Sequence, residues 1–230
     1  MRTKSEICSL LTNPGIIAVV RAQKVDQVIP LSEALLAGGV IAIEITLTTP
    51  NALQAIHDAR AKFGDHALIG IGTVLDARAC QAAIEAGAEY VVTPVCRPEL
   101  VAIAHAAERP IMLGAFTPTE AQTAHEAGAD FIKVFPADVL GPTYIRALRA
   151  PLPHLRIIPT GGVELGNVLD FVQAGCAALG VGSALVSNRL LQVADWQVLT
   201  QKASAFVKAL REARESKVTG TDTAAKRQLC

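Results

Sequence analysis

Apolar and polar positions follow a pattern that recurs along the chain. In each copy, an alanine-rich segment with helical spacing ends at an Ala-Gly pair, and a short run rich in β-branched residues follows. Glycine at that point can adopt the left-handed conformation that ends a helix and turns the chain back toward a strand. The pattern occurs clearly four times, and its predicted strands are residues 40–46, 90–93, 131–135 and 177–182.

Four further apolar runs lie between these copies, at residues 16–20, 67–71, 110–113 and 156–159. The eight predicted strands start 20 to 27 residues apart with a helical segment in each interval, which is typical of parallel β-α units rather than hairpins. In a chain of 230 residues, this repeat predicts an α/β protein with a single-domain (β/α)8 TIM barrel, in preference to an open doubly wound sheet.

The C-terminal residues set the predicted domain boundary. A last helix is expected over about residues 194–214, so the barrel domain spans residues 1–214. Residues 215–230 are rich in Ser, Thr, Ala and Lys and offer no apolar face. We therefore expect them to form a flexible tail.

Composition narrows the class of protein. Hydrophobic residues make up 51% of the chain and charged residues 18%, which excludes a disordered protein. The 21 basic and 21 acidic side chains cancel, so no net field attracts nucleic acid. Five scattered cysteines without a C-x-x-C pair fit reduced thiols. With no signal-peptide block, and with glycines interrupting the longest uncharged stretch, residues 171–188, we expect a cytoplasmic protein that does not span a membrane.

The second predicted strand places a carboxylate inside the barrel. Its isoleucines share the face that packs under helices, whereas Ala42, Glu44 and Thr46 share the opposite, inward face. An unpaired buried charge is costly, so Glu44 must be paired or protonated.

The sixth predicted strand places a lysine inside the barrel. Phe131, Lys133 and Phe135 occupy one face and alternate with Ile132 and Val134. Apolar neighbours disfavour the ammonium form, and the neutral amine is the form that attacks a carbonyl carbon. Lys133 is therefore a candidate nucleophile. The alternative is a purely structural ion pair between Lys133 and Glu44.

Other polar residues follow the ends of predicted strands, where barrels build their catalytic face. Arg21 suits a carboxylate or a phosphate, although an arginine that only extends into solvent at a strand end is an equal alternative. Hydroxyls follow three more strands, at Thr73, Thr93 and Thr160. Each of these threonines alone could be a cap or turn residue. The prediction of a site rests on several of them occurring together at the ends of strands.

Two glycine-rich loops, residues 160–163 and 180–183, follow the last two predicted strands, where barrels often bind phosphate through backbone amides. Neither contains G-x-G-x-x-G and no Walker lysine is present, so a sugar phosphate is favoured over a nucleotide. The five histidines form no H-E-x-x-H motif or metal triad, and there is no G-x-S-x-G motif. We therefore expect neither a metal nor a serine nucleophile.

Dispersed motifs between about residues 15 and 213 occur in an order that points to one family. They are Glu44-Ile45-Thr46-Leu47-Thr48-Thr49-Pro50, Gly72-Thr73-Val74-Leu75, Thr93-Pro94, Phe131-Ile132-Lys133-Val134-Phe135-Pro136, Pro159-Thr160-Gly161-Gly162-Val163 and Gly182-Ser183-Ala184-Leu185. Together they resemble the 2-keto-3-deoxy-6-phosphogluconate (KDPG) and 4-hydroxy-2-oxoglutarate (KHG) aldolase family. The resemblance implies a metal-free class I aldolase, a lyase in which Lys133 forms a Schiff base and Glu44 transfers protons.

The resemblance also implies binding roles. Arg21 would hold the pyruvyl carboxylate, in a pocket lined by Thr73, Pro94 and Phe135. The phosphate cradle would consist of Gly161, Gly162, Gly182 and Ser183, with Thr160 beside it. The implied partners are a small 2-keto-3-deoxy sugar acid phosphate and pyruvate, no cofactor is needed beyond the imine on Lys133, and the implied assembly is a homotrimer.

Two positions bear on the substrate. Many members of the family carry an arginine four residues after the glutamate, where this chain has Thr48, and members without it generally keep the arginine that Arg21 supplies. Related galactonate-specific enzymes resemble this chain at the first strand and at residues 141–145, but they tend to have an apolar residue in place of Thr160. The resemblance therefore favours cleavage of KDPG to pyruvate and glyceraldehyde 3-phosphate, the Entner–Doudoroff reaction, with KHG cleavage and oxaloacetate decarboxylation as further activities.

Three alternatives stay open. They are an aldolase for the galactonate epimer, a sugar-phosphate barrel that works without an imine, such as an epimerase, and a protein that binds such a metabolite without turning it over.

Overall fold

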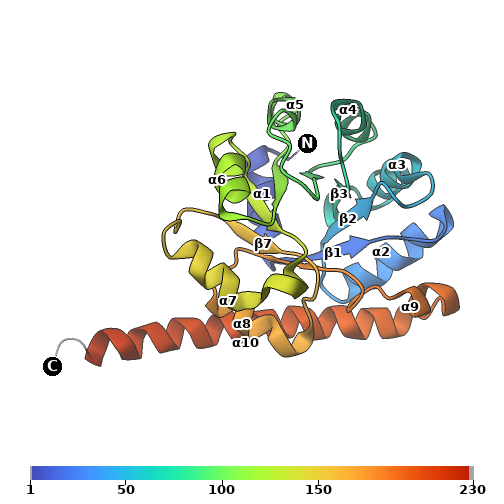
Figure 1. Ribbon diagram of the computed structural model, residues 1–230. Coiled ribbons are helices and arrows are strands. Elements are labelled where there is room, and N and C mark those ends of the chain that lie inside the picture. Colours follow the sequence, from blue (N-terminus) through green and yellow to red (C-terminus); the bar gives the residue numbers. More distant parts are fainter. Residues whose placement is uncertain (1, 228–230) are drawn as a thin grey trace.

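The computed structural model describes residues 2–227 and the side chains of residues 2–217. Eight parallel strands form one sheet in the order β7-β6-β5-β4-β3-β2-β1-β8. A bridge between Thr160 and Gly180 joins the two ends of this order, so the sheet is nearly closed. The helices surround it (Figure 1). The predicted (β/α)8 barrel is confirmed.

The strands lie where the apolar runs predicted them. They are β1 (Ile16–Val20), β2 (Ala42–Thr46), β3 (Leu68–Gly72), β4 (Val91–Val92), β5 (Ile111–Ala115), β6 (Phe131–Val134), β7 (Ile157–Pro159) and β8 (Leu179–Val181). The short β4 is continued on both sides by ladder hydrogen bonds, from the Ile71 amide to the Tyr90 carbonyl and from the Thr93 amide to the Met112 carbonyl.

Most helices follow a strand and cover the barrel. In chain order they are α1 (Lys4–Thr12), α2 (Val28–Ala37), α3 (Ala52–Phe63), α4 (Ala77–Glu85), α5 (Leu100–Ala106), α6 (Pro118–Glu126), α7 (Ala137–Arg149), α8 (Val168–Gln173), α9 (Asn188–Val193) and α10 (Trp196–Arg227). Among the described residues, none of these helices combines the length and the apolar character needed to cross a membrane.

Helix α1 closes the N-terminal end of the barrel and was not identified from the sequence. Thr3 and Glu6 form a capping box that starts it. Its Ile7 and Leu11, four residues apart on one face, are fully buried against the barrel interior. The interior cluster that they join consists of Ile17, Ala42, Leu68, Tyr90, Val92, Met112, Phe131, Ile158 and Ala178.

The register places the polar residues above this apolar layer, nearer the C-terminal ends of the strands. Val19 on β1 lies opposite Glu44 on β2, and Lys133 on β6 lies opposite Gly114 on β5. Because α1 fills the other end, the polar interior opens only toward the loops that follow the strands.

Helix α10 is longer than expected. Leu199, Ala203, Phe206, Leu210 and Ala213 are buried at intervals of three or four residues, and the helix packs against α2 and α8. It continues to Arg227 and extends past the rest of the molecule (Figure 1), so the expected helix end near residue 214 is wrong. The stretch after residue 214 contains no proline, the residue that most strongly ends a helix. Flexibility of this segment stays a prediction, and residues 228–230 lie outside the described residues.

Candidate active site

Two charged side chains meet inside the barrel. The Lys133 Nζ on β6 lies 3.4 Å from the Glu44 Oε1 on β2, and the two side chains are only 7% and 3% exposed. The Lys133 Nζ also lies 5.4 Å from the centroid of the Phe135 ring. The alternation of residues in the two strands predicted that both side chains point inward. Glu44 therefore has the partner that its burial requires.

Glycines on two other strands allow close approaches inside the barrel. A Cβ built on Gly72 of β3 would overlap the Glu44 carboxylate, and a Cβ on Gly114 would overlap the Pro94 backbone. The sequence analysis did not identify these glycines as part of the site. The signal that could have found them is their inward phase on β3 and β5, since glycine inside a strand marks a close approach.

The barrel opens into a cavity of about 340 Å³. It brings together six predicted site residues from four strand ends, Arg21, Phe135, Thr160, Gly161, Gly182 and Ser183. Its wall also contains Val19, Val186 and Asn188, which the sequence analysis did not single out. Asn188 is the first residue of α9 and offers an amide at the rim.

Other predicted residues lie outside this cavity. Pro94 lines a neighbouring cavity of about 280 Å³ that shares only Phe135 with the first. Thr73 follows β3 with a positive φ of 63°, and it lines neither of the two cavities. Arg21 and Pro94 thus line two different cavities that share Phe135, and the four expected pocket residues are not gathered in one cavity.

The loop after β7 has the backbone of an anion cradle. Gly161 and Gly162 have φ values of 90° and 68°, which favour glycine. A Cβ on Gly162 would overlap Asp138 at the start of α7. Within the described residues, the amides of Gly161, Gly162 and Ser183 donate to no protein acceptor. These amides are therefore available to an anion at the mouth.

Arg21 stands at the rim, exposed to solvent. Its Nε donates a hydrogen bond of 2.9 Å to the Thr48 Oγ1, which in turn lies 2.8 Å from the Thr46 Oγ1. Arg21 is therefore anchored to the loop after β2 and is among the residues that line the cavity.

Tyr90 lies below the charged pair, fully buried, with its ring against Gly70. Burial, and secondarily the Glu44 carboxylate, hold the pKa of Tyr90 well above its ordinary value of 10.0. Among the described residues its hydroxyl has no hydrogen-bond partner. The sequence analysis did not identify Tyr90, because it gave weight only to polar residues toward the ends of strands.

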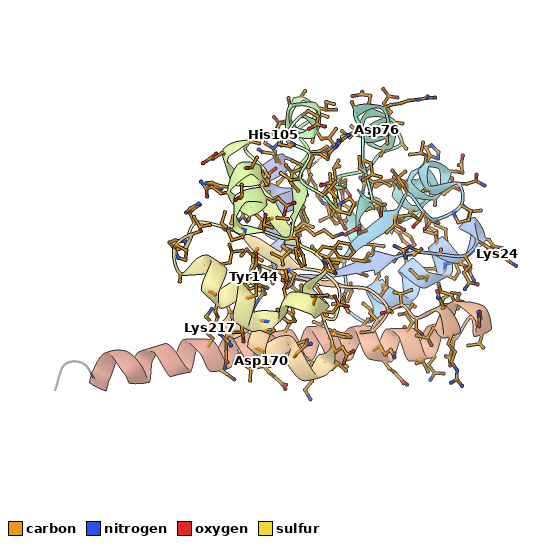
Figure 2. All side chains as sticks on the ribbon, viewed as in Figure 1. Lys24, Asp76, His105, Tyr144, Asp170 and Lys217 are labelled. Carbon is orange, nitrogen blue, oxygen red and sulfur yellow. The ribbon has the colours of Figure 1, made fainter. Side chains whose placement is uncertain are left out.

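The histidines lie away from the barrel mouth. Figure 2 shows His105 on α5 at the periphery, and its Nε2 lies 2.8 Å from the Asp130 Oδ2. His154 pairs with Gln122, and His57 with Asp58. Among the side chains of residues 2–217, no group of three or more His, Cys, Asp or Glu is arranged to hold a metal ion.

Comparison with known proteins adds independent evidence. The model of the KDPG and KHG aldolase family matches residues 7–202. The 2-dehydro-3-deoxy-6-phosphogalactonate aldolase of Escherichia coli K12 is 39% identical, over 88% of this chain and 97% of that protein. The 2-dehydro-3-deoxy-phosphogluconate aldolase of Pseudomonas aeruginosa is 36% identical, over 84% of this chain and 87% of that protein.

A solved structure is similar throughout the barrel. It is a KDPG aldolase from Legionella pneumophila with pyruvate captured at low pH as a covalent carbinolamine intermediate. The TM-score is 0.81 at 28% sequence identity, over 87% of this chain and 97% of that one.

Proposed function

Since this chain belongs to the KDPG and KHG aldolase family, and is therefore an aldolase, we propose that it cleaves KDPG to pyruvate and glyceraldehyde 3-phosphate by class I chemistry at Lys133. The observation that carries the proposal is the buried amine of Lys133, placed 3.4 Å from the Glu44 carboxylate inside the barrel and beside Phe135, which lines the cavity at the mouth. Family membership disfavours the epimerase-like barrel and the non-catalytic binding protein.

The first half of the reaction forms the imine. Glu44 takes a proton from the Lys133 ammonium, the neutral amine attacks the C2 carbonyl of the substrate, and the resulting carbinolamine takes up a proton and loses water to give a protonated imine. Glu44 is within reach of the amine and transfers the protons that addition and dehydration require. The pyruvate carbinolamine captured in the Legionella pneumophila relative supports this step.

The second half breaks the carbon–carbon bond. Glu44 accepts the proton of the C4 hydroxyl, the C3–C4 bond breaks, and its electron pair moves into the cationic imine to give an enamine. Glyceraldehyde 3-phosphate leaves, and the enamine takes up a proton at C3. Hydrolysis of the resulting imine then releases pyruvate and restores the amine.

The charges along the cavity fit the two anionic ends of this substrate. Arg21 offers a planar fork for the carboxylate. The amides of Gly161, Gly162 and Ser183, with Gly182 beside them, offer donors for the phosphate. Of the pyruvyl pocket expected from the sequence, Phe135 lines the cavity of Arg21, whereas Pro94 lines the neighbouring cavity and Thr73 lines neither, so we propose Phe135 as the wall of the pocket beside Arg21. Arg21 lines the same cavity as the phosphate loops, so the two anionic groups lie on one continuous surface.

Thr160 supports the gluconate epimer over the galactonate epimer. Its side chain is nearly buried and lines the cavity together with Gly161, Gly182 and Ser183. A hydroxyl there can hydrogen-bond a substrate hydroxyl that an apolar side chain would leave unpaired. The galactonate-aldolase relative is the basis of the alternative, in which the C4 epimer is the better substrate.

A coupled assay tests this choice. Pyruvate released from each epimer is measured with lactate dehydrogenase, for the wild type and for Thr160→Val. We expect kcat/KM to favour KDPG and the preference to fall at least tenfold in Thr160→Val. A wild type that prefers the galactonate epimer would instead support the alternative. The same assay with KHG, and disappearance of oxaloacetate, measure the further activities.

We also propose a homotrimer in the cytoplasm. Four apolar side chains that follow the ends of consecutive strands β2 to β5 stay between 37% and 47% exposed, and we call them the apolar arc: Leu53, Leu75, Val95 and Phe116. Exposed apolar side chains that follow four consecutive strands support contact with a second copy of the chain.

A further inference from the structure

The arginine that we expect to meet the substrate carboxylate is held by one hydrogen bond. The Arg21 Nε donates to the Thr48 Oγ1 at 2.9 Å. Nε lies in the plane of the guanidinium, so a bond there fixes the orientation of the plane and leaves both Nη atoms for a ligand. Within the described residues, neither Nη atom of Arg21 has a protein partner. An exposed arginine without such an anchor would sample many rotamers.

Thr48 is itself firmly placed. Its Oγ1 lies 2.8 Å from the Oγ1 of Thr46, a buried residue two positions after Glu44 on the inward face of β2. The turn between them is closed by a 2.9 Å hydrogen bond from the Thr49 amide to the Thr46 carbonyl. The Thr49 Oγ1 accepts a further bond of 3.2 Å from the Ala22 amide, which ties this turn to the end of β1.

These contacts form a continuous path from the barrel interior to the rim. Thr46 is fixed by burial, Thr48 is fixed by Thr46 and the turn, and Arg21 is fixed by Thr48. The path starts on the strand that carries Glu44, so it sets the position of the guanidinium relative to the catalytic carboxylate.

We propose that Thr48 is a positioning residue, which holds Arg21 so that both Nη atoms can bind the carboxylate of the 2-keto acid. This inference rests on the proposed function, because Arg21 meets such a carboxylate only if the substrate is a 2-keto acid. Thr48 does not touch the reacting atoms. Its effect is therefore expected on substrate binding, whereas the chemical steps at Lys133 are left intact.

The experiment measures trapping of pyruvate by borohydride as a function of pyruvate concentration. Pyruvate has the carboxylate and the carbonyl but no phosphate, so it reports on the carboxylate site alone. In Thr48→Val, which removes the hydroxyl and keeps the shape, we expect the half-saturating pyruvate concentration to rise about 3- to 10-fold. The kcat for KDPG should stay within about twofold. Thr48→Ser, which keeps the hydroxyl, should restore binding to within about twofold.

The matched control is Thr143→Val. The Thr143 Oγ1 also accepts a hydrogen bond from an arginine, Arg146, at 3.2 Å, but on the exposed surface of α7. This variant should bind pyruvate like the wild type. Thermal unfolding of each variant checks the fold, and Thr48→Ala replaces Thr48→Val if the valine variant does not fold.

A double-mutant cycle with Arg21→Met tests whether the effect of Thr48 on pyruvate binding depends on Arg21. If Thr48 acts through Arg21, Thr48→Val should add no further loss in the Arg21→Met background. An unchanged half-saturating pyruvate concentration in Thr48→Val, or the same fold-loss in both backgrounds, would overturn the positioning role. Wild-type protein that forms no adduct at Lys133 would overturn the proposed function itself. If the wild type forms the adduct and Thr48→Val binds pyruvate equally well, only the positioning role of Thr48 is overturned.

Discussion

Lys133 and Glu44 bury two charges at positions where apolar side chains would pack without the cost of desolvating charged groups. Replacing both members of a buried ion pair by apolar side chains of similar volume is often neutral or stabilising, so a purely structural role is a poor explanation for two charges buried this deeply. At the scale of single residues, catalysis is the better explanation of this pair.

Glu44→Gln tests that explanation. The amide keeps the shape of the carboxylate but cannot accept the C4 proton, so we expect kcat to fall about 10²- to 10⁴-fold. Steady-state pyruvate release measures the loss, with circular dichroism as the check of folding. A variant within twofold of the wild type would remove Glu44 from the mechanism. Lys133→Ala should lose turnover altogether.

Tyr90 provides a stability prediction at the same scale. Its hydroxyl is buried without a partner among the described residues, which costs about 1 to 3 kcal/mol relative to a satisfied group. Tyr90→Phe should therefore unfold at the same urea concentration as the wild type at pH 7, or a higher one. A loss above about 1 kcal/mol would show that the hydroxyl is satisfied in solution.

The raised pKa of Tyr90 makes this difference depend on pH. The unfolded chain releases the phenolic proton near pH 10.0, whereas the folded chain retains it, so the folded state binds more protons above that pH. The contribution of the Tyr90 hydroxyl to the free energy of unfolding therefore has its full value below pH 10 and falls as the pH rises further. Between pH 9 and pH 11, the free energy of unfolding measured by urea titration should fall less for Tyr90→Phe than for the wild type. Equal decreases in the two proteins would show that the pKa of Tyr90 is not raised in the folded state.

The sequence predicted the charged residues of the site but not the residues that accommodate them. Alternation within a strand is a local signal, and it was sufficient to place Glu44 and Lys133 inside the barrel. Which residue lies beside Glu44 depends on the register between β2 and β3, which no local pattern contains. The inward phase of Gly72 could mark a point of close approach, but only the three-dimensional structure shows that Glu44 is the side chain beside it and that Thr48 anchors Arg21.

At the scale of elements, runs of apolar residues predicted all eight strands because parallel strands are buried on both faces. Helix α1 was missed because it follows no strand and so falls outside the repeat. The end of α10 was misplaced because the loss of an apolar face does not by itself end a helix.

Helix α1 is expected to be essential for stability, because it closes the barrel. Leu11→Ala removes a fully buried side chain and should lower the free energy of unfolding by about 2 to 5 kcal/mol. Leu10→Ala on the same helix is the matched control, since Leu10 is only partly buried. Equal losses in the two variants, measured by urea unfolding, would show that α1 does not close the barrel as described.

At the scale of the whole molecule, the apolar arc predicts assembly. Light scattering on a sizing column should give a mass about three times the 24.1 kDa of the chain. Leu75→Glu combined with Val95→Glu should shift the protein to monomers, because burying two carboxylates in an apolar contact is costly. Val193→Glu, exposed on α9 outside the arc, should leave the mass unchanged. A trimer that survives the double substitution would place the interface elsewhere.

The central claim is that the amine of Lys133 forms an imine with a 2-keto acid. The most direct test incubates the folded protein with pyruvate and borohydride and maps the modified peptide by mass spectrometry. We predict a reduced adduct on Lys133, and no adduct in Lys133→Ala. A folded wild-type protein that forms no adduct, or forms one at a different lysine, would contradict the account.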